Sequence, residues 1–192
     1  MKSVTRMILA TAILIMGARN VMATEEAAYK VVEKDNQFEI RDYAPHILAE
    51  TVVDGSLEDA GNSAFRPLFQ YISGDNGTHG KVPMTAPVGQ QPAQEKWAVS
   101  FMMPAAYTLG TLPAPADPKI TLRPVPARRV AAVRYSGFWS EKNYLRSKSQ
   151  LEAWIRAKGL TVAGDPVWAR YNPPFTPWFL RRNEILIPVD TK

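Results

Sequence analysis

Residues 38–55, FEIRDYAPHILAETVVDG, decide the fold, because the chain repeats their pattern at residues 120–137, ITLRPVPARRVAAVRYSG. The two stretches align without a gap at an offset of 82 residues, which places Arg41 on Arg123 and Gly55 on Gly137. Each stretch contains two short runs with the alternation of half-buried strands. We therefore predict two similar units in one chain.

Each unit is predicted to contain strands on both sides of one helix. Ser56 and Ser140 stand where an N-cap hydroxyl is expected, and Gly74 and Gly159 stand where a helix ends in a left-handed residue. The expected elements of the first unit are strands at 29–34, 38–43 and 47–53, a helix at about 57–72, and strands near 82–88 and 97–103. Those of the second unit are strands near 120–125 and 130–135, a helix at about 141–158, and strands near 167–171 and 184–189.

A proline-rich linker separates the two units. The stretch 104–118, PAAYTLGTLPAPADP, is unfavourable for a central strand, so the first unit spans about 29–103 and the second about 119–189. A sheet covered by a single helix does not bury both of its faces, which favours joining the two sheets. The predicted class is α+β: two strand-helix-strand-strand repeats forming a distorted antiparallel β-barrel flanked by two helices.

The first 23 residues have the pattern of a cleavable export signal. Lys2 and Arg6 precede the apolar run 7–18, MILATAILIMGA, which is shorter than the roughly 20 apolar residues that span a bilayer. We predict cleavage after Ala23, a mature domain at 24–192, and a periplasmic or secreted location without a stable membrane anchor after processing.

Charge and cysteine content exclude several classes of partner. Removing the leader takes away Lys2, Arg6 and Arg19, which leaves 20 basic residues against 18 acidic ones, a formal charge of +2. Nothing remains of the concentrated basic stripe that binds a phosphate backbone, so we predict no nucleic-acid partner. The absence of cysteine excludes disulfides, thiolate metal sites and covalent haem attachment.

Histidine chemistry is restricted to His46 and His79. No nucleophile motif accompanies them, and we assign no catalytic residue; whether the chain is an enzyme stays open, with a binding protein favoured. His79 lies in a glycine-bounded loop and is a possible axial ligand to a haem iron, or else a solvated loop residue.

Two aromatic residues of the first predicted helix and one methionine that follows the helix in the sequence are candidate ligand contacts. Phe65 and Phe69 flank its apolar stripe, where they either close the core or line a groove. Met84 lies between the two prolines of KVPMTAPV, residues 81–88, in what reads as an edge strand. Its side chain is suited to filling the core or to lying against a flat ligand ring.

The stretch 171–189, YNPPFTPWFLRRNEILIPV, predicts a stiff loop followed by a strand. Aromatic rings next to Arg181 and Arg182 suit a planar ligand that carries carboxylates, since guanidinium groups bind carboxylates bidentately. An equally weighted alternative is that the rings close one end of the barrel while the arginines pair with Glu184.

Three stretches together resemble the SOUL/haem-binding protein family, in its exported bacterial branch: 29–50, 81–88 and 171–187. The resemblance implies two similar units in a distorted barrel, and non-covalent binding of haem or another tetrapyrrole in a groove beside the first helix. Together with the loop and helix arguments, it gives the candidate binding residues Asn62, Phe65, Arg66, Phe69, Met84, Phe175, Trp178, Phe179, Arg181 and Arg182.

Three functions stay open at this point. The leading one is an exported tetrapyrrole-binding protein that sequesters, buffers or carries haem. The second resembles the GyrI-like group, a small-molecule binder or hydrolase in which Glu184, its pKa raised by burial, acts with Tyr171 and Trp178. The third is a ligand-free protein-interaction domain.

Overall fold

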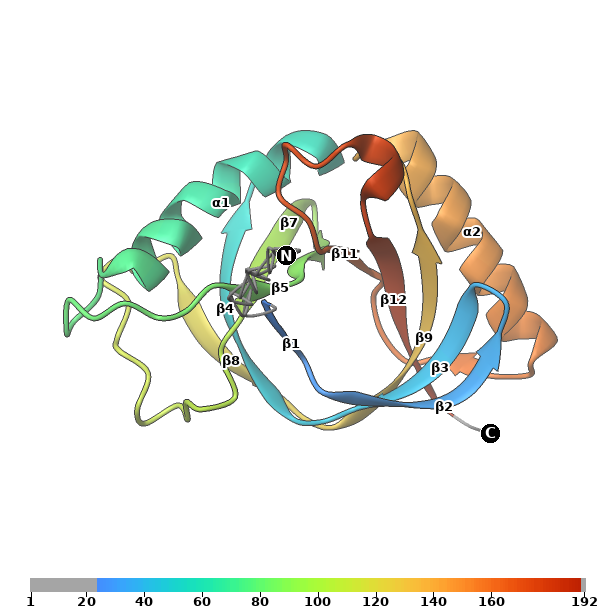
Figure 1. The fold of residues 1–192 in the computed structure, drawn as a ribbon, viewed down its shortest axis with the longest axis horizontal. Helices are drawn as coiled ribbons and strands as arrows, with labels where there is room; N and C mark the ends of the chain where they lie inside the picture. The colour runs from blue at the N-terminus through green and yellow to red at the C-terminus, as the bar shows by residue number, and fades with distance from the viewer. Residues whose placement is uncertain (1–23, 191–192) are drawn as a thin grey trace, which may run out of the picture.

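The computed structural model describes residues 24–190 as one large curved sheet with two long helices (Figure 1). The predicted leader, residues 1–23, lies outside the described residues. Within the part of the chain that is described, no helix is long and apolar enough to cross a membrane.

The helices are α1 (Leu57–Ser73) and α2 (Glu141–Ala157), with a short 3-10 helix, η1 (Trp178–Leu180). The first strands are β1 (Glu25–Glu26), β2 (Tyr29–Asp35), β3 (Phe38–Tyr43), β4 (His46–Val53), β5 (Thr85–Ala86), β6 (Val88–Ala93) and β7 (Lys96–Met102). The remaining strands are β8 (Thr121–Val125), β9 (Arg128–Tyr135), β10 (Thr161–Val162), β11 (Val167–Arg170) and β12 (Asn183–Asp190).

The ten-stranded sheet is antiparallel throughout but does not close into a barrel. Its order is β2-β3-β9-β12-β11-β6-β7-β4-β8, with β10 beside β12, while β1 pairs with β5 in parallel. The α+β prediction is confirmed, whereas β2 and β8 remain as edges. Both have features of protected edges: β2 carries exposed charged side chains, and β8 contains Pro124, which has no N–H to donate.

The strand order has an internal symmetry. The counterparts in the two units are β3 and β8, β4 and β9, β6 and β11, and β7 and β12. When the strand order β3-β9-β12-β11-β6-β7-β4-β8 is reversed and each strand is replaced by its counterpart, the same order results. The first repeated strand of each unit thus pairs with the second repeated strand of the other, β3 with β9 and β8 with β4. This is the order expected of two joined repeats, although the duplication itself stays a prediction.

One stretch differs from the predicted strands. Residues 82–88 do not form a continuous strand, because Pro83 and Pro87 have no N–H to offer a ladder. Only Thr85–Ala86 pairs, with β1, and the longer strand β6 begins at Val88. The sequence of β6, VGQQPA, lacks apolar alternation, which is why the pattern did not predict it.

Both helices pack on the same side of the sheet, α1 against β4 and β7 and α2 against β9 and β12 (Figure 1). Ala64, Leu68 and Ile72 form part of the buried stripe of α1. The predicted caps are present: Ser56 Oγ accepts from the Asp59 amide at 3.1 Å, and Ser140 Oγ accepts from the Asn143 amide at 3.4 Å. The chain after β11 then runs between the two helices (Figure 1).

Candidate functional site

A groove of about 470 Å³ lies between α1, the segment before β6 and the loop that follows β11. Its volume falls within the roughly 300–1,000 Å³ typical of small-molecule sites. The walls are mainly apolar and include Phe65, Phe69, Met84, Trp139 and Phe175.

The α1 wall consists of side chains that the core does not use. Phe65 and Phe69 are one helical turn apart, and their rings stack with centroids 5.7 Å apart. Phe65 also contacts Phe101 edge-on at 5.4 Å, which fixes its orientation. Phe69 keeps 47% of its surface exposed, because the neighbouring Leu68 takes the fully buried position. The flank of α1 therefore presents a flat aromatic surface to the groove.

The opposite wall is a stiff loop held by Arg181. Its Nε donates to the Thr176 carbonyl at 2.8 Å and its Nη2 donates to the Pro174 carbonyl at 2.6 Å. The same guanidinium lies 4.4 Å from the centre of the Trp139 ring. These contacts present Phe175, which is 86% exposed, at the mouth of the groove.

Arg170 lies deep in the groove and was missed by the sequence analysis. It is the last residue of β11 and only 7% exposed. Its Nη2 donates to Gln90 Oε1 at 3.1 Å, and its guanidinium lies 5.0 Å from the Trp168 ring centre and 5.4 Å from that of Trp139. The available signal was strand alternation, which places Arg170 on the same face as Trp168.

Arg170 is a buried cation without a carboxylate partner among the described residues. Its Nε is buried and has no hydrogen-bond partner in that part of the chain. Burial lowers the pKa of Arg170 to about 10, so the side chain still carries its charge at neutral pH.

The sequence matches the family described as "SOUL heme-binding protein" over residues 24–188. The chain belongs to the SOUL haem-binding family. It is 28% identical to "Heme-binding protein 1" of Mus musculus over 142 residues, which cover 70% of this chain and 74% of the mouse protein.

Two solved structures show the same fold as this SOUL domain at low sequence identity. The EcmrR C-terminal domain has a TM-score of 0.63 at 14% identity, covering 81% of this chain and 98% of that one. A hydrolase from Listeria innocua has a TM-score of 0.57 at 10% identity, covering 83% and 94% of the two chains. At these identities the likeness concerns the fold alone.

Five of the ten predicted binding residues of the SOUL domain line the groove: Asn62, Phe65, Phe69, Met84 and Phe175. Arg66 is exposed on α1 and does not line it. Arg181 holds the loop, as described above, and Arg182 donates from Nε to Glu184 Oε1 at 3.0 Å and from Nη1 to Glu26 at 2.9 Å. Both arginines thus have protein partners, and propionate binding by either stays a prediction.

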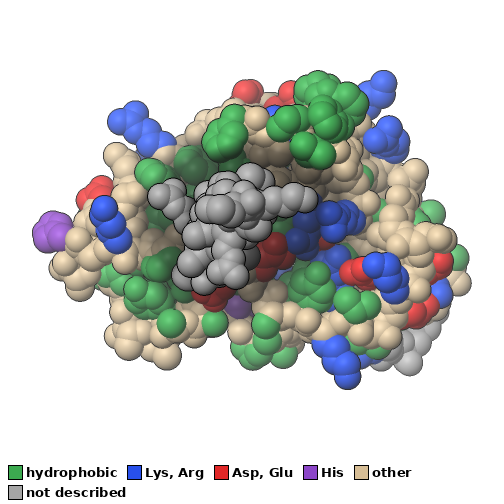
Figure 2. Space-filling model, in the orientation of Figure 1, with side chains coloured by type: hydrophobic (Ala, Val, Ile, Leu, Met, Phe, Trp, Pro, Cys, Tyr) green, Lys and Arg blue, Asp and Glu red, His purple; other side chains and the backbone are tan. Residues whose placement is uncertain are grey.

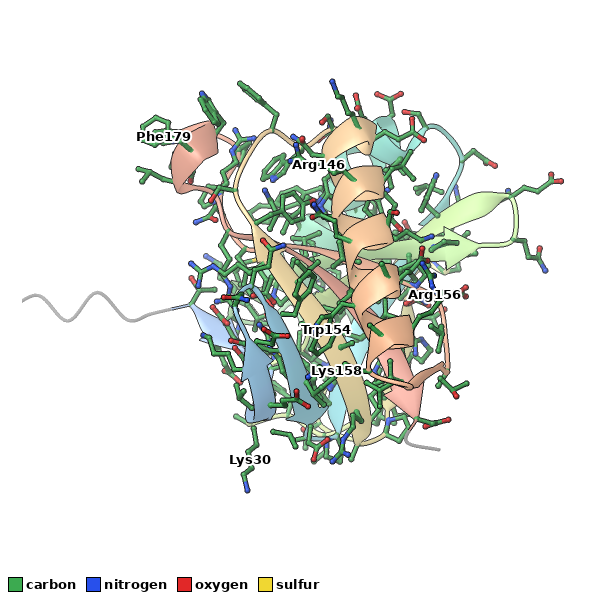
Figure 3. All side chains as sticks on the ribbon, turned by 90° about the vertical axis from the view of Figure 1, so that its right-hand side faces the viewer. Lys30, Arg146, Trp154, Arg156, Lys158 and Phe179 are labelled. Carbon is green, nitrogen blue, oxygen red and sulfur yellow. The ribbon has the colours of Figure 1, made fainter. Side chains whose placement is uncertain are left out.

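Trp178 and Phe179 lie on η1, outside the groove, in an exposed aromatic patch. Trp178 stacks on Phe138 with centroids 5.4 Å apart, and Phe179 meets Trp178 edge-on. Phe179 is 58% exposed and points away from the body of the molecule (Figure 3). Figure 2 shows hydrophobic side chains gathered at the top of the view, over the loop that carries η1.

His79 is exposed on the loop after α1, with a positive φ of 54°, and does not line the groove. Residues 24–190 contain no cluster of three metal-ligating side chains. Axial ligation by His79 therefore stays a prediction, and Met84 is the soft side chain that the groove itself offers.

Glu184 is fully buried in a hydrogen-bonded network with Arg41, Tyr171 and Arg182, which we call the Glu184 network. Arg41 donates from Nη1 to Oε2 at 2.7 Å and from Nη2 to Oε1 at 3.2 Å, and the Tyr171 hydroxyl donates to Oε2 at 2.9 Å. Trp178 contacts Phe138 and Phe179 instead of this network.

The Glu184 carboxyl is held in its charged form. Burial raises its pKa, but the hydrogen bond and charge of Arg41, together with Arg182, outweigh burial and leave the pKa below its usual value. The expectation of a raised pKa is therefore wrong: Arg182 pairs with Glu184, as one alternative of the sequence interpretation has it, and Arg41, from a strand distant in the chain, adds a second guanidinium that was not predicted. A carboxylate so paired is unsuited to acting as a general base.

Proposed function

We propose that this SOUL protein binds haem or another tetrapyrrole non-covalently in the groove between α1 and the loop after β11. The observation that carries the proposal is the set of aromatic side chains that the core leaves exposed on both walls, Phe65 and Phe69 on one side and Phe175 on the other. Family membership and the name of the mouse relative support the same ligand class.

The groove residues fit the chemistry of a tetrapyrrole. Aromatic rings provide stacking surface for a flat macrocycle, and Arg170 provides a charge complementary to a propionate. A separate pocket beside Tyr43 and Tyr171 has a volume of only about 60 Å³. Haem supplies a redox-active iron when bound, but the groove contacts favour recognition of the ring rather than of the metal.

The biological role we propose is sequestration, buffering or transport of the tetrapyrrole outside the cytoplasm. The leader pattern of residues 1–23 supports export to the periplasm or the medium. The low net charge after cleavage supports a small-molecule partner rather than nucleic acid.

Absorbance titration of residues 24–192 with haem and with iron-free protoporphyrin IX tests this function. We expect saturable binding of about one equivalent of either compound at micromolar or tighter affinity. The variant His79→Ala tests axial ligation: a loss of haem affinity alone would support it, whereas the position of His79 outside the groove favours unchanged affinity for both compounds. Binding that is weak and does not saturate would contradict the proposal.

The exposed aromatic patch favours a second candidate, a protein-interaction domain. Phe138, Trp178, Phe179 and Leu180 each leave about half or more of their surface exposed. Contiguous apolar surface of this kind marks docking sites in many proteins. Failure of the protein to bind any porphyrin or hydrophobic dye would favour this candidate over the first.

A further inference from the structure

Arg170 and Glu184 lie on neighbouring strands, but only Glu184 has its charge balanced within the described residues. Glu184 contacts two guanidinium groups, whereas the side chain of Arg170 donates to the neutral Gln90. Transfer of a charge out of water is unfavourable unless the charge is paired. A buried cation that lines a groove and has no counter-ion is therefore suited to an anion that arrives with a ligand.

The surroundings of Arg170 fix its guanidinium in place. Gln90 accepts from Nη2 and itself donates from Nε2 to the Leu57 carbonyl at 2.7 Å, which ties Arg170 to the start of α1. The rings of Trp139 and Trp168 lie beside the guanidinium. Gly61 faces the same group, and a Cβ there would collide with both Nη atoms. The absence of a side chain at Gly61 thus leaves the space that the guanidinium occupies.

We propose that Arg170 is the recognition group for a carboxylate on an otherwise apolar ligand, so that the groove selects acids over their esters. Carboxylates match the planar donor fork of arginine, and pairing in a buried site strengthens the interaction. The inference rests on the proposed function in one respect: the expected ligand is a tetrapyrrole, whose propionate is the carboxylate concerned.

The test compares protoporphyrin IX with its dimethyl ester, which has the same ring but no negative charge. Hydrogen bonds to charged groups predict that the wild type binds the acid about ten- to a hundredfold more tightly. Arg170→Met is expected to abolish this preference and leave ester binding unchanged. Arg146→Met, on the exposed face of α2 (Figure 3), is the matched control and should keep the preference.

Two further measurements test whether the lost preference for the acid in Arg170→Met results from a loss of folding. Because Arg170→Met removes an unpaired buried charge, the thermal midpoint of the ligand-free variant should equal or exceed that of the wild type. Gly61→Ala keeps the arginine but forces its guanidinium to move, and should also weaken the preference. Ser63→Ala, at an exposed position of the same helix, should not.

The outcomes separate the inference from the proposed function. If the wild type binds neither porphyrin, the proposed function fails, and the carboxylate site is then tested with dansylundecanoic acid against its methyl ester. A preference for that acid which disappears in Arg170→Met would support the carboxylate site alone. Three results would overturn the carboxylate site. The wild type could bind acid and ester with equal affinity, or bind neither the porphyrin pair nor the dansyl pair. The preference for the acid could also survive in Arg170→Met.

Discussion

Two charged residues of adjacent strands illustrate how burial acts at the scale of single residues. Glu184 is fully buried yet keeps a low pKa, since Arg41 and Arg182 compensate for the lost hydration. Arg170 is similarly buried but lacks such a partner among the described residues, and burial lowers its pKa. The first arrangement stabilises the fold, whereas the second leaves a charge available to a ligand.

Glu184→Gln is expected to destabilise the protein by about 1.5–3 kcal/mol, because Arg41 and Arg182 lose their charge-assisted hydrogen bonds to the buried carboxylate and each keeps one other carboxylate partner, Glu39 or Glu26. Urea unfolding of the variant and the wild type measures this difference. Glu95→Gln, at an exposed position, is the control and should change stability by less than about 0.5 kcal/mol. Unchanged stability in Glu184→Gln, with lost binding of cationic aromatic compounds, would instead support the GyrI-like alternative.

The Glu184 network also predicts a specific dependence of stability on pH. Since the folded-state pKa of Glu184 lies below its ordinary value of 4.5, the unfolded chain binds this proton at a higher pH than the folded protein does. The stabilisation is therefore fully present above pH 4.5 and decreases as pH falls through the folded-state pKa. The difference in unfolding free energy between wild type and Glu184→Gln should shrink over that range; a constant difference would contradict the assignment.

At the scale of elements, α1 serves both the core and the groove. Its buried stripe packs on β4 and β7, while Phe65 and Phe69 on its flank face the groove. The helical periodicity of the sequence places both rings on this flank but does not distinguish core from groove, because that depends on whether another element covers the flank. The loop after β11 approaches the flank without filling the space between them.

Helix boundaries were predictable from local chemistry. The structure places α1 at Leu57–Ser73 and α2 at Glu141–Ala157, each within one residue of the prediction, because cap residues mark helix ends in the sequence itself. The position of Arg170 in the groove and the strand β6 were not predicted. Their environments depend on residues distant in the chain, such as Gly61 and Gln90, and local periodicity does not report such contacts.

Phe69→Ala and Phe179→Ala form a matched pair that locates the ligand. Both remove an exposed phenyl ring, but only Phe69 lines the groove. We expect Phe69→Ala to weaken protoporphyrin binding by about tenfold or more, since it removes an apolar contact surface. Phe179→Ala should leave the affinity unchanged in the same fluorescence titration. The reverse result would move the site to the exposed aromatic patch.

At the scale of the whole molecule, the groove lies between the two predicted units. Its α1 wall comes from the first unit and its loop wall from the second, and the β11–β6 pair joins the units beneath it. Ligand binding should therefore stabilise the contact between the units. No part of the local sequence pattern specifies this arrangement, which follows from the symmetric strand order.

Thermal unfolding tests the coupling of binding to folding. A free protoporphyrin concentration of about 100 times Kd should add about 2.7 kcal/mol, which corresponds to a rise of about 5–10 °C in Tm for a domain of this size. Phe69→Ala should show a smaller rise at the same ligand concentration. An unchanged Tm in the wild type would mean that the native state does not bind the ligand preferentially.

A crystal structure of residues 24–192 with bound protoporphyrin IX would locate the ligand. We expect the macrocycle between the Phe65–Phe69 surface and Phe175, with one carboxylate within hydrogen-bond distance of Arg170. A macrocycle bound on the exposed aromatic patch or against the concave side of the sheet, with Arg170 still lacking a carboxylate partner, would contradict this expectation.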